Sequence, residues 1–497
     1  MPSFIFANLD YNIKYMGDEK NSGGMRQAMQ DMEKYQTSAD TIAAISTPFG
    51  TGGIGIVRIS GPEAFEIAAR VFLSKKPFDQ LCSHTVTHGR IVDPADGRML
   101  DEVLLVKMEG PKTFTAEDVV EIDCHGGITL LKNVLQLVLR QGARAAEPGE
   151  FTKRAFINGR MDLAQAEAVI DLINAKTDEG TRAAASQLEG RLSQSIRSAR
   201  KKLIGLIAQM EAVVDYPEHD IEELTGDRIY AGVQEVKGEL ENIAEGFERG
   251  RLIREGISAA IVGKPNAGKS SLLNVLSGSS RAIVTDVPGT TRDIIEEYIN
   301  VRGIPIRFLD TAGIRSTLDP VESIGVERAR KAALEAELVI VVLDAQTGIV
   351  PEDLEILKDM RDKKKIALIN KIDKSFDDKI IEMKQQLSKK ENMPVVIASM
   401  LDGTGMEDLL QAIEGLFLKG VIDANNEVLI TNARHKQLLE NAAQCLEQAA
   451  NAHLQGFALD LVTIDIKESA EYLGQITGES TSEDVVNEIF SRFCIGK

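Results

Sequence analysis

The chain has 497 residues, 43% of them hydrophobic and 27% charged, so it holds apolar material for more than one core and suggests about three domains. Its formal net charge of −19 makes the surface as a whole repel phosphate backbones, so contact with nucleic acid requires a local basic patch or a partner protein. No apolar run approaches the roughly 18 residues of a membrane span, and four cysteines without C-x-x-C pairs favour a reducing cytoplasm over a disulfide framework or a cysteine zinc site.

Residues 1–37 differ in composition from the rest of the chain. Their apolar start is too short for a secretory signal, and their acidic residues are unlike those of an organellar transit peptide. We expect a disordered extension over 1–37.

From Thr41 the pattern becomes strand-like and is punctuated by glycine. The runs "TIAAISTPFGTGGIGIVRISGP", "HTVTHGRIVD", "DEVLLVKM" and "EDVVEIDCHGG" predict strands, and "ITLLKNVLQLVLR" predicts a helix among them. Short strands and helices in this order predict a compact α+β domain over residues 38–155.

Two groups of histidine and cysteine residues in this region invite a metal interpretation. Cys82, His84 and His88 fall in an expected strand and lack a fourth ligand, so we interpret them as structural. Cys124, next to His125, is interpreted in the same way.

Helical periodicity dominates residues 156–254 and returns in residues 417–497. In the first block an amphipathic helix is predicted by apolar residues at spacings of three to four, as in Leu188, Leu192, Ile196, Leu203, Ile207 and Met210. Between the blocks, residues 255–416 alternate strands and helices as in a doubly wound parallel sheet. This order is what an insertion into a helical bundle would look like, and it is equally compatible with separate helical units.

The sequence "GKPNAGKS", from Gly263 to Ser270, fits the phosphate-binding pattern G-x-x-x-x-G-K-S and lies between an apolar strand and a helical pattern. The backbone N–H groups of such a loop wrap a β-phosphate at a helix N-terminus. Lys269 would reach the β- and γ-phosphates, and the hydroxyl of Ser270 would ligate Mg²⁺.

Two further segments complete the phosphate side of this predicted site. "IRFLDTAG" ends a strand at Asp310, which is placed to hold Mg²⁺ indirectly, and Gly313 offers its N–H to the γ-phosphate. "TDVPGTTRD", residues 285–293, occupies the place of a loop that orders around the γ-phosphate, where Thr290 or Thr291 can supply the second Mg²⁺ hydroxyl. The residue after Gly313 is Ile314, which cannot hold a water molecule, so another group must position the attacking water.

The run "IALINKID" predicts a strand that ends in base-recognition residues. A carboxylate accepts hydrogen bonds from both N1–H and the 2-amino group of guanine, whereas adenine offers neither, so Asp373 is expected to select GTP over ATP. Asn370 would brace the loop, the stem of Lys371 would cover the base, and Ser399 would close the pocket through its backbone. The candidate GTP-binding residues are Gly263, Asn266, Ala267, Gly268, Lys269, Ser270, Ser271, Thr285, Asp286, Val287, Pro288, Gly289, Thr290, Thr291, Asp310, Thr311, Ala312, Gly313, Asn370, Lys371, Asp373 and Ser399.

With these motifs in place, the sequence resembles the tRNA-modification GTPase family called MnmE or TrmE, from about Thr41 to Lys497. The resemblance rests on "TPFGTGGIGIVRISG", "PGEFTKRAFINGRMDLAQAEAVIDLI", the GTPase motifs and the terminal "FCIGK". It implies an N-terminal formyl-tetrahydrofolate-binding and dimerisation domain, a discontinuous helical domain, and a doubly wound Ras-like P-loop GTPase domain inserted between its halves.

The resemblance also implies which groups take part in positioning the attacking water and in stabilising the phosphates. It assigns a potassium ion near the phosphates to Asn266, Thr285, Val287 and Thr290, and it assigns Mg²⁺ to Ser270 and Thr291. It gives Glu322 the role of orienting the attacking water as a catalytic residue. The alternative for Glu322 is a carboxylate in the first turn of a helix, where the helix dipole favours it.

For the N-terminal domain, the resemblance implies that Arg58, Glu121, Arg160 and Lys497 bind folate. A carboxylate can pair with the aminopyrimidine edge of a pterin and arginines suit the folate carboxylates, although ordinary surface ion pairs would also account for these residues. The family commonly has lysine at position 160. Cys494 becomes a candidate catalytic nucleophile whose thiol a nearby lysine could activate, the alternative being a cysteine that only packs.

The function implied is a potassium-dependent GTP hydrolase that works with an FAD-dependent partner of the MnmG or GidA type. The homodimer and its partner, as a heterotetramer, would add a carboxymethylaminomethyl or aminomethyl group at C5 of wobble uridine 34 in tRNA, using a one-carbon unit from 5-formyl-tetrahydrofolate or a related folate. The acidic balance predicts tRNA contact mainly through the partner, and the lack of a long apolar run predicts no contact with a membrane. The alternative is a ribosome-assembly GTPase switch, which would favour a basic RNA-binding module with a GXXG loop, and none appears after position 416.

Overall fold

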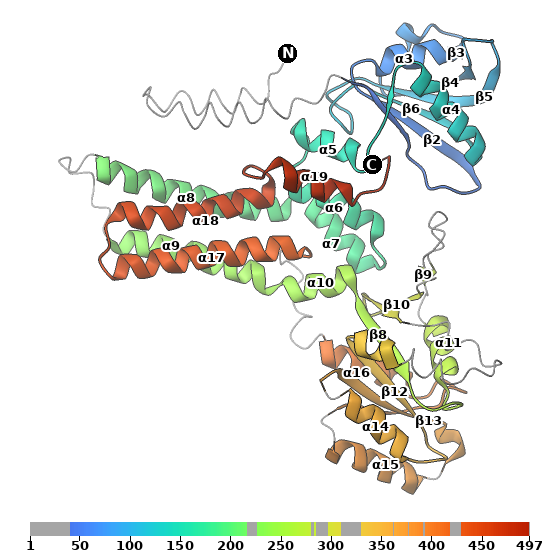
Figure 1. Cartoon of the computed structure of the whole chain (residues 1–497), viewed down its shortest axis with the longest axis vertical. Helices are drawn as coiled ribbons and strands as arrows, with labels where there is room; N and C mark the ends of the chain where they lie inside the picture. Colours follow the sequence, from blue (N-terminus) through green and yellow to red (C-terminus); the bar gives the residue numbers. More distant parts are fainter. Residues whose placement is uncertain are drawn as a thin grey trace. The chain divides into compact units, whose positions relative to one another are not determined.

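The computed structural model describes residues 40–215, 226–279, 283–284, 297–309, 330–360, 362–375, 377–390, 393–417 and 429–496 (Figure 1). Its contacts divide the chain into two compact units. The first unit is Met1–Arg160 with Phe490–Lys497, and the second is Met161–Ile489. The last residues of the chain therefore belong to the same unit as its first domain.

The first unit is built on a seven-stranded sheet in the order β3-β4-β5-β6-β2-β1-β7. Neighbouring strands are antiparallel except for the parallel pair β1 and β7. The elements are β1 (Ile42–Ile45), β2 (Gly52–Ser60), α3 (Ala64–Val71), β3 (Phe72–Ser74), β4 (Thr85–Val92), β5 (Met99–Met108), β6 (Val119–Gly126), α4 (Ile128–Arg140), β7 (Arg144–Ala145) and α5 (Glu150–Ile157).

The helices α3 and α4 cover one face of this sheet, as Figure 1 shows. Alternate residues of the central strands point into the layer between sheet and helices, among them Val57, Val120 and Ile122, and they pack there against Ile67 and Val134. Because successive strand residues face opposite sides, the residues between them, such as Arg58 and Glu121, lie on the other face. The sequence predictions of strands β4, β5 and β6 and of helix α4 are confirmed.

The second unit contains a helical bundle whose core is drawn from both sides of the α/β segment. Helices α8 (Arg191–Asp215), α9 (Gly226–Glu245), α17 (Ala433–Leu454) and α18 (Leu459–Thr477) lie side by side (Figure 1). Leu203 and Leu240, from before the α/β segment, share one apolar core with Leu446 and Ile466, from after it. The shorter helices are α6 (Leu163–Asn174), α7 (Asp178–Leu188), α10 (Phe247–Glu255) and α19 (Glu483–Ser491).

One predicted helical run is interrupted. The spacing that joined Leu188 to Leu192 predicted a single helix, but α7 ends at Leu188 and α8 begins at Arg191. Between them Gly190 adopts φ +88°, a left-handed conformation that ends helices and that glycine tolerates best. The prediction of continuity across Leu188 was therefore wrong.

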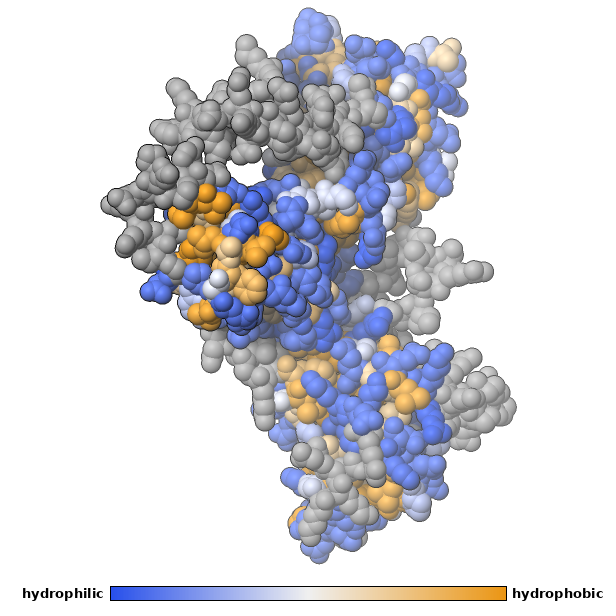
Figure 2. All heavy atoms as spheres, turned by 60° about the vertical axis from the view of Figure 1, so that its left-hand side comes forward, coloured by the Kyte–Doolittle hydropathy of each residue, from blue (hydrophilic) through white to orange (hydrophobic). Residues whose placement is uncertain are grey.

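Apolar side chains are also exposed where α17 runs into α18. Figure 2 faces this end of the bundle and shows apolar residues gathered there. Leu454, Phe457, Leu461 and Ile464 are each about half exposed or more.

No helix among the described residues is both long and apolar enough to cross a membrane.

The α/β segment forms a second seven-stranded sheet in the order β14-β13-β12-β8-β11-β10-β9. The strands from β14 to β11 are parallel, and β10 and β9 are antiparallel at the edge. Its elements are β8 (Ile257–Val262), α11 (Lys269–Ser279), β9 (Ile283–Val284), β10 (Glu297–Val301), β11 (Ile304–Phe308), β12 (Leu338–Asp344), α14 (Pro351–Asp359), β13 (Lys364–Asn370), α15 (Asp377–Lys390), β14 (Val395–Ile397) and α16 (Met406–Phe417).

Apolar cores lie on both faces of this sheet, because its central strands are buried on both sides. Ile340 packs on one face and Val339 and Val341 on the other. This is the double covering expected of a parallel sheet. Because β8, β12 and β13 run parallel, their carboxyl ends meet at one edge of the sheet. Open α/β sheets bind ligands at this edge.

Candidate functional site

The first part of the site is the loop between β8 and α11. Gly263 and Gly268 have positive φ, and a Cβ on either would lie 2.3 Å from the Val342 carbonyl oxygen or 2.1 Å from Asn370 Nδ2, so only glycine fits at both positions. The loop leads directly into the N-terminus of α11, and the N-terminus of a helix favours an anion. The predicted phosphate-binding residues from Gly263 to Ser271 therefore lie together in this loop and in the first turn of α11.

Lys269 folds back across this loop. Its Nζ donates to the carbonyl oxygens of Gly263 and Lys264, at 2.8 and 2.7 Å. Burial lowers the pKa of the Lys269 ammonium. A partly buried cation held by two neutral carbonyls is a favourable partner for a phosphate group, which would supply the negative charge that the loop lacks.

The second part of the site is the end of β13, which a hydrogen bond connects to the loop between β8 and α11. The Nδ2 of Asn370 donates to the Ala267 carbonyl at 2.8 Å, and its Oδ1 accepts from the Met400 N–H at 3.1 Å. Asn370 is only 2% exposed. The side chain thus ties the phosphate loop to the loop after β14, as the sequence predicted when it gave Asn370 a bracing role.

The predicted base-recognition residues gather beside Asn370. Ser399 Oγ donates to Asp373 Oδ1 at 3.2 Å, which brings those two residues together. Lys371 adopts φ +64° and its Nζ donates to the Asn266 carbonyl at 2.5 Å. Lys371 also contacts Asp344 at the end of β12, a residue that sequence reasoning did not select. One feature of the sequence could have indicated Asp344, because its carboxylate directly follows the apolar run "LVIVVL".

Several predicted residues lie outside the described ranges, so the structure does not place them. They are Thr285, Asp286, Val287, Pro288, Gly289, Thr290, Thr291, Asp310, Thr311, Ala312, Gly313, Glu322 and Lys497.

A second cluster lies on the face of the first unit's sheet opposite to α3 and α4. Arg58 of β2 and Glu121 of β6 face each other in register, with Arg58 Nε and Nη2 both 2.7 Å from Glu121 Oε1. The guanidinium of Arg58 lies 5.6 Å from the Phe151 ring centroid and 5.7 Å from that of Phe114. Arg160 lies 5.0 Å from the same Phe114 ring. The structure therefore brings the three described residues of the predicted folate set together around an aromatic ring that the sequence did not indicate.

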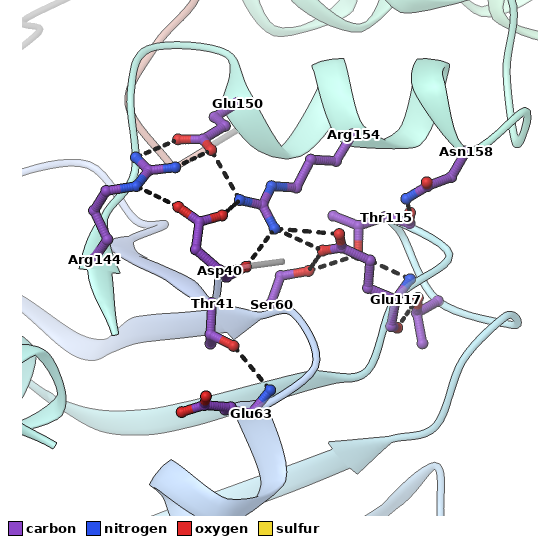
Figure 3. Close-up of polar contacts among 11 residues, drawn as sticks. Asp40, Thr41, Ser60, Glu63, Thr115, Glu117, Arg144, Glu150, Arg154 and Asn158 are labelled. Carbon is purple, nitrogen blue, oxygen red and sulfur yellow. Dashed lines mark hydrogen bonds and ion pairs between the residues drawn. The ribbon is translucent and has the colours of Figure 1, made fainter. Parts of the chain in front are cut away.

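Helix α5 holds this cluster in place through a buried ionic network. Figure 3 shows Arg154 pointing from α5 between Asp40, Glu117 and Glu150. Its guanidinium nitrogens lie 2.8, 3.2 and 3.0 Å from those carboxylates, and its side chain is 3% exposed. A buried arginine with several carboxylate partners fixes geometry, since removal of the guanidinium would take away the cation that these carboxylates share.

Residues directly after α5 also fix the loop that carries Phe114. Asn158 Nδ2 donates to the Thr115 carbonyl at 2.7 Å (Figure 3), and Arg160 Nη1 donates to the Phe114 carbonyl at 3.1 Å. Burial lowers the pKa of Arg160. Two arginines thus lie close to the ring of Phe114, an arrangement that suits a flat aromatic ligand carrying carboxylates.

The chain's last residues dock beside this cluster. The Gly149 N–H donates to the Cys494 carbonyl at 3.3 Å, and Arg58 Nη1 donates to the Gly496 carbonyl at 3.4 Å. A Cβ on Gly496 would lie 2.4 Å from the Ile45 carbonyl oxygen, so the tail approaches β1 closely. The docked tail places Cys494, which is exposed, in the same unit as Arg58 and Glu121.

Two other cysteines are poor nucleophiles. Burial, with the nearby carboxylates of Asp101 and Asp123, raises the pKa of Cys124 to about 12, and burial raises that of Cys445 to about 11. Cys82 and Cys494 are exposed. In the part of the chain that the structure describes, no group of three or more His, Cys, Asp or Glu side chains is arranged to hold a metal ion. His88 instead pairs with Glu102, 3.0 Å away.

The glycine loop between β8 and α11, with Asn370 and Asp373 at the adjoining sheet edge, defines a P-loop nucleotide-binding protein. Residues 41–160 match the family model described as the GTP-binding protein TrmE N-terminus, and residues 163–494 match that of the MnmE helical domain. The chain belongs to the MnmE family.

Individual relatives agree along nearly their whole length. Each of the following is named tRNA modification GTPase MnmE. The protein from Acetivibrio thermocellus is 59% identical over 92% of this chain and 99% of its own length. That from Alkaliphilus oremlandii is 48% identical over 92% of this chain and 99% of its own, and that from Geobacillus thermodenitrificans is 47% identical over 93% and 100%.

Proposed function

We propose that this chain is a GTP hydrolase that acts in tRNA modification, as the names of its relatives state for them. The observation that carries the proposal is the joining of Asn370 to the Ala267 carbonyl, because it fixes the base-recognition strand to the phosphate loop. Asp373, which Ser399 contacts, would then accept hydrogen bonds from N1–H and the 2-amino group of guanine. A nucleotide would bridge the two parts of one site.

We propose that hydrolysis requires Mg²⁺ and K⁺. Ser270 and Thr291 would hold Mg²⁺, and Thr285, Val287 and Thr290 would hold K⁺ together with Asn266. The described residues fit, since hydroxyl and amide oxygens are ligands that hard cations accept. Asn266 is exposed and its carbonyl is engaged by Lys371, so its side-chain oxygen is the atom it would offer. K⁺ would supply positive charge near the phosphates.

Because Ile314 cannot position a water molecule, Glu322 is the group proposed to orient the attacking water. The monovalent ion itself can be tested directly by comparing GTP turnover in potassium and sodium buffers of equal ionic strength. Faster turnover in potassium is expected, and equal turnover would remove the potassium site from the proposal.

For the first unit we propose a site for 5-formyl-tetrahydrofolate or a related folate. Arg58 and Arg160, which both lie close to Phe114, suit the ring and the carboxylates of such a ligand. Glu121, with Lys497, would complete the site. Because Arg58 holds Glu121 Oε1, a pterin would either meet the other carboxylate oxygen or displace the pair.

Cys494 is proposed as a nucleophile near the one-carbon unit that this folate would supply. The product proposed is tRNA carrying a carboxymethylaminomethyl or aminomethyl group at C5 of wobble uridine 34. An FAD-dependent partner of the MnmG or GidA type would join a homodimer of this chain in a heterotetramer. The partner would also bring most of the tRNA-binding surface, because the net charge of −19 is unfavourable for tRNA.

The nucleotide assignment is tested by the substitution Asp373→Asn. An asparagine amide can donate to the 2-oxo group of xanthine but cannot accept from the 2-amino group of guanine while also accepting from N1–H. We therefore expect GTP hydrolysis to fall and XTP hydrolysis to appear. The matched control is Asp362→Asn at an exposed carboxylate of the same segment, which should behave as wild type. Unchanged GTP turnover in the Asp373 variant would refute the base assignment.

A further inference from the structure

The carboxylate of Asp344 lies at the same sheet edge as the base-recognition residues. Asp344 ends β12 and is directly opposite Asn370, the last residue of β13, in the parallel pairing. The Ala345 N–H continues this pairing by donating to the Asn370 carbonyl at 2.9 Å. Because parallel strands bind ligands at their carboxyl ends, Asp344 is placed beside the nucleotide site without belonging to any of its sequence motifs.

Each oxygen of the Asp344 carboxylate has its own partner. Oδ2 lies 2.7 Å from Lys371 Nζ, and Oδ1 accepts from the Gln346 N–H at 2.9 Å. The Asp344 side chain is only 13% exposed, so solvent screens its attraction for the ammonium group less than at an open surface.

The ammonium of Lys371 is held from two sides. Besides Asp344 it contacts the Asn266 carbonyl of the phosphate loop at 2.5 Å. A lysine side chain loses rotamer entropy when it is fixed, and one neutral carbonyl alone would restrain it weakly. Together the carboxylate and the carbonyl fix the end of the side chain, and its aliphatic stem is then fixed as well.

We propose that Asp344 is a positioning residue for guanine nucleotide binding. Its carboxylate fixes the ammonium of Lys371 against the Asn266 carbonyl before the nucleotide arrives, so the stem that covers the base is already ordered. Ordering a side chain in advance increases affinity, because binding no longer has to restrict it. Asp344 touches no part of the nucleotide and acts through Lys371. The inference rests on the proposed function, in that it assumes a guanine nucleotide in this site.

A purely structural role would give a different result, and a double-mutant cycle separates the two. Asp344→Asn removes the charge and keeps an oxygen for the Gln346 N–H. Lys371→Met removes the ammonium and keeps an apolar stem. If Asp344 acts through Lys371, the Asp344 substitution has no further effect in the Lys371→Met background, whereas a role in the 344–348 turn would be the same in both backgrounds.

The measurement is the release of a fluorescent GDP derivative from the full chain, followed by stopped flow. We expect Asp344→Asn to accelerate release about tenfold, the factor that a charge-assisted hydrogen bond of about 1.4 kcal/mol gives. The double variant should release no faster than Lys371→Met alone. The ratio of GDP to IDP affinity should stay at the wild-type value in Asp344→Asn, because Asp373 and its Ser399 contact are untouched.

Three results would overturn the inference. The first is that Asp344→Asn releases the nucleotide as slowly as wild type and the Asp362→Asn control. The second is that the effects of the two substitutions add in the double variant, and the third is that the Asp344→Asn protein does not fold. Wild-type protein that fails to bind GDP would instead refute the proposed function, so the two failures are distinguishable.

Discussion

The carboxylate of Glu167 and the imidazole of His435 lie 2.6 Å apart, although 268 residues separate them in the chain. Glu167 belongs to α6, which precedes the α/β segment, and His435 belongs to α17, which follows it. Arg434 completes the cluster, with its Nη2 2.8 Å from Glu167 Oε2. One buried carboxylate therefore joins the two halves of the helical bundle where the chain returns to it.

This cluster predicts a large loss of stability on substitution of Glu167. Glu167→Gln removes the buried carboxylate that pairs with the partly buried Arg434 guanidinium, and breaking a buried ion pair costs about 3–5 kcal/mol. We expect a lower midpoint for the thermal transition of the helical bundle in differential scanning calorimetry. Glu440→Gln is the matched control on α17, because Glu440 pairs with Lys436 on the surface and such pairs contribute about 0.5 kcal/mol or less. Equal midpoints for the two variants would show that the cluster contributes little.

The same residue predicts a defined acid sensitivity. Burial alone would raise the pKa of Glu167, but His435 and Arg434 outweigh it and lower the pKa from its ordinary value of 4.5 to about 2. A carboxyl group whose pKa falls on folding stabilises the folded state above its unfolded pKa and loses that contribution as pH falls through the folded value.

The stability difference between wild type and Glu167→Gln should therefore be constant near neutral pH and shrink between pH 4.5 and about 2. Urea unfolding of both proteins across this range measures it. A difference that stays constant down to pH 2 would show that Glu167 does not carry the lowered pKa.

Local patterns in the sequence predicted several strands of both sheets, helix α4 and the nucleotide motifs. Helix α4 has the predicted bounds, Ile128–Arg140, because its apolar spacing and its flanking glycine are both local. The contact between Asn370 and the phosphate loop was also predictable, because strands of a parallel sheet bring their carboxyl ends together.

What the sequence did not predict depends on contacts between distant segments. Phe114 lies in a loop with no local signal, and its role appears only when α5 brings Arg160 against it. Arg154 and Asp40 are 114 residues apart, and nothing in either neighbourhood indicates the other. Asp344 ends an ordinary apolar strand, so its contact with Lys371 becomes visible only in the folded sheet.

The close packing around Gly149 allows a prediction of how firmly the chain's last residues are held. It caps α5 with φ +68°, and a Cβ there would lie 2.7 Å from the Phe490 carbonyl oxygen and 2.8 Å from Phe493 Cβ. Gly159 has a similar φ of +72° but no atom within 4 Å of an added Cβ. Gly149→Ala and Gly159→Ala thus share the backbone strain of about 1–2 kcal/mol, and only the first adds a collision with the tail.

We therefore expect Gly149→Ala to lower the unfolding midpoint of the first unit more than Gly159→Ala does. It should also accelerate removal of the C-terminal residues by carboxypeptidase, because the tail loses both the space beside Gly149 and the hydrogen bond from its N–H to the Cys494 carbonyl. Gly159→Ala should be digested at the wild-type rate. If both variants are digested equally fast, the packing of Phe490 and Phe493 against Gly149 does not hold the tail.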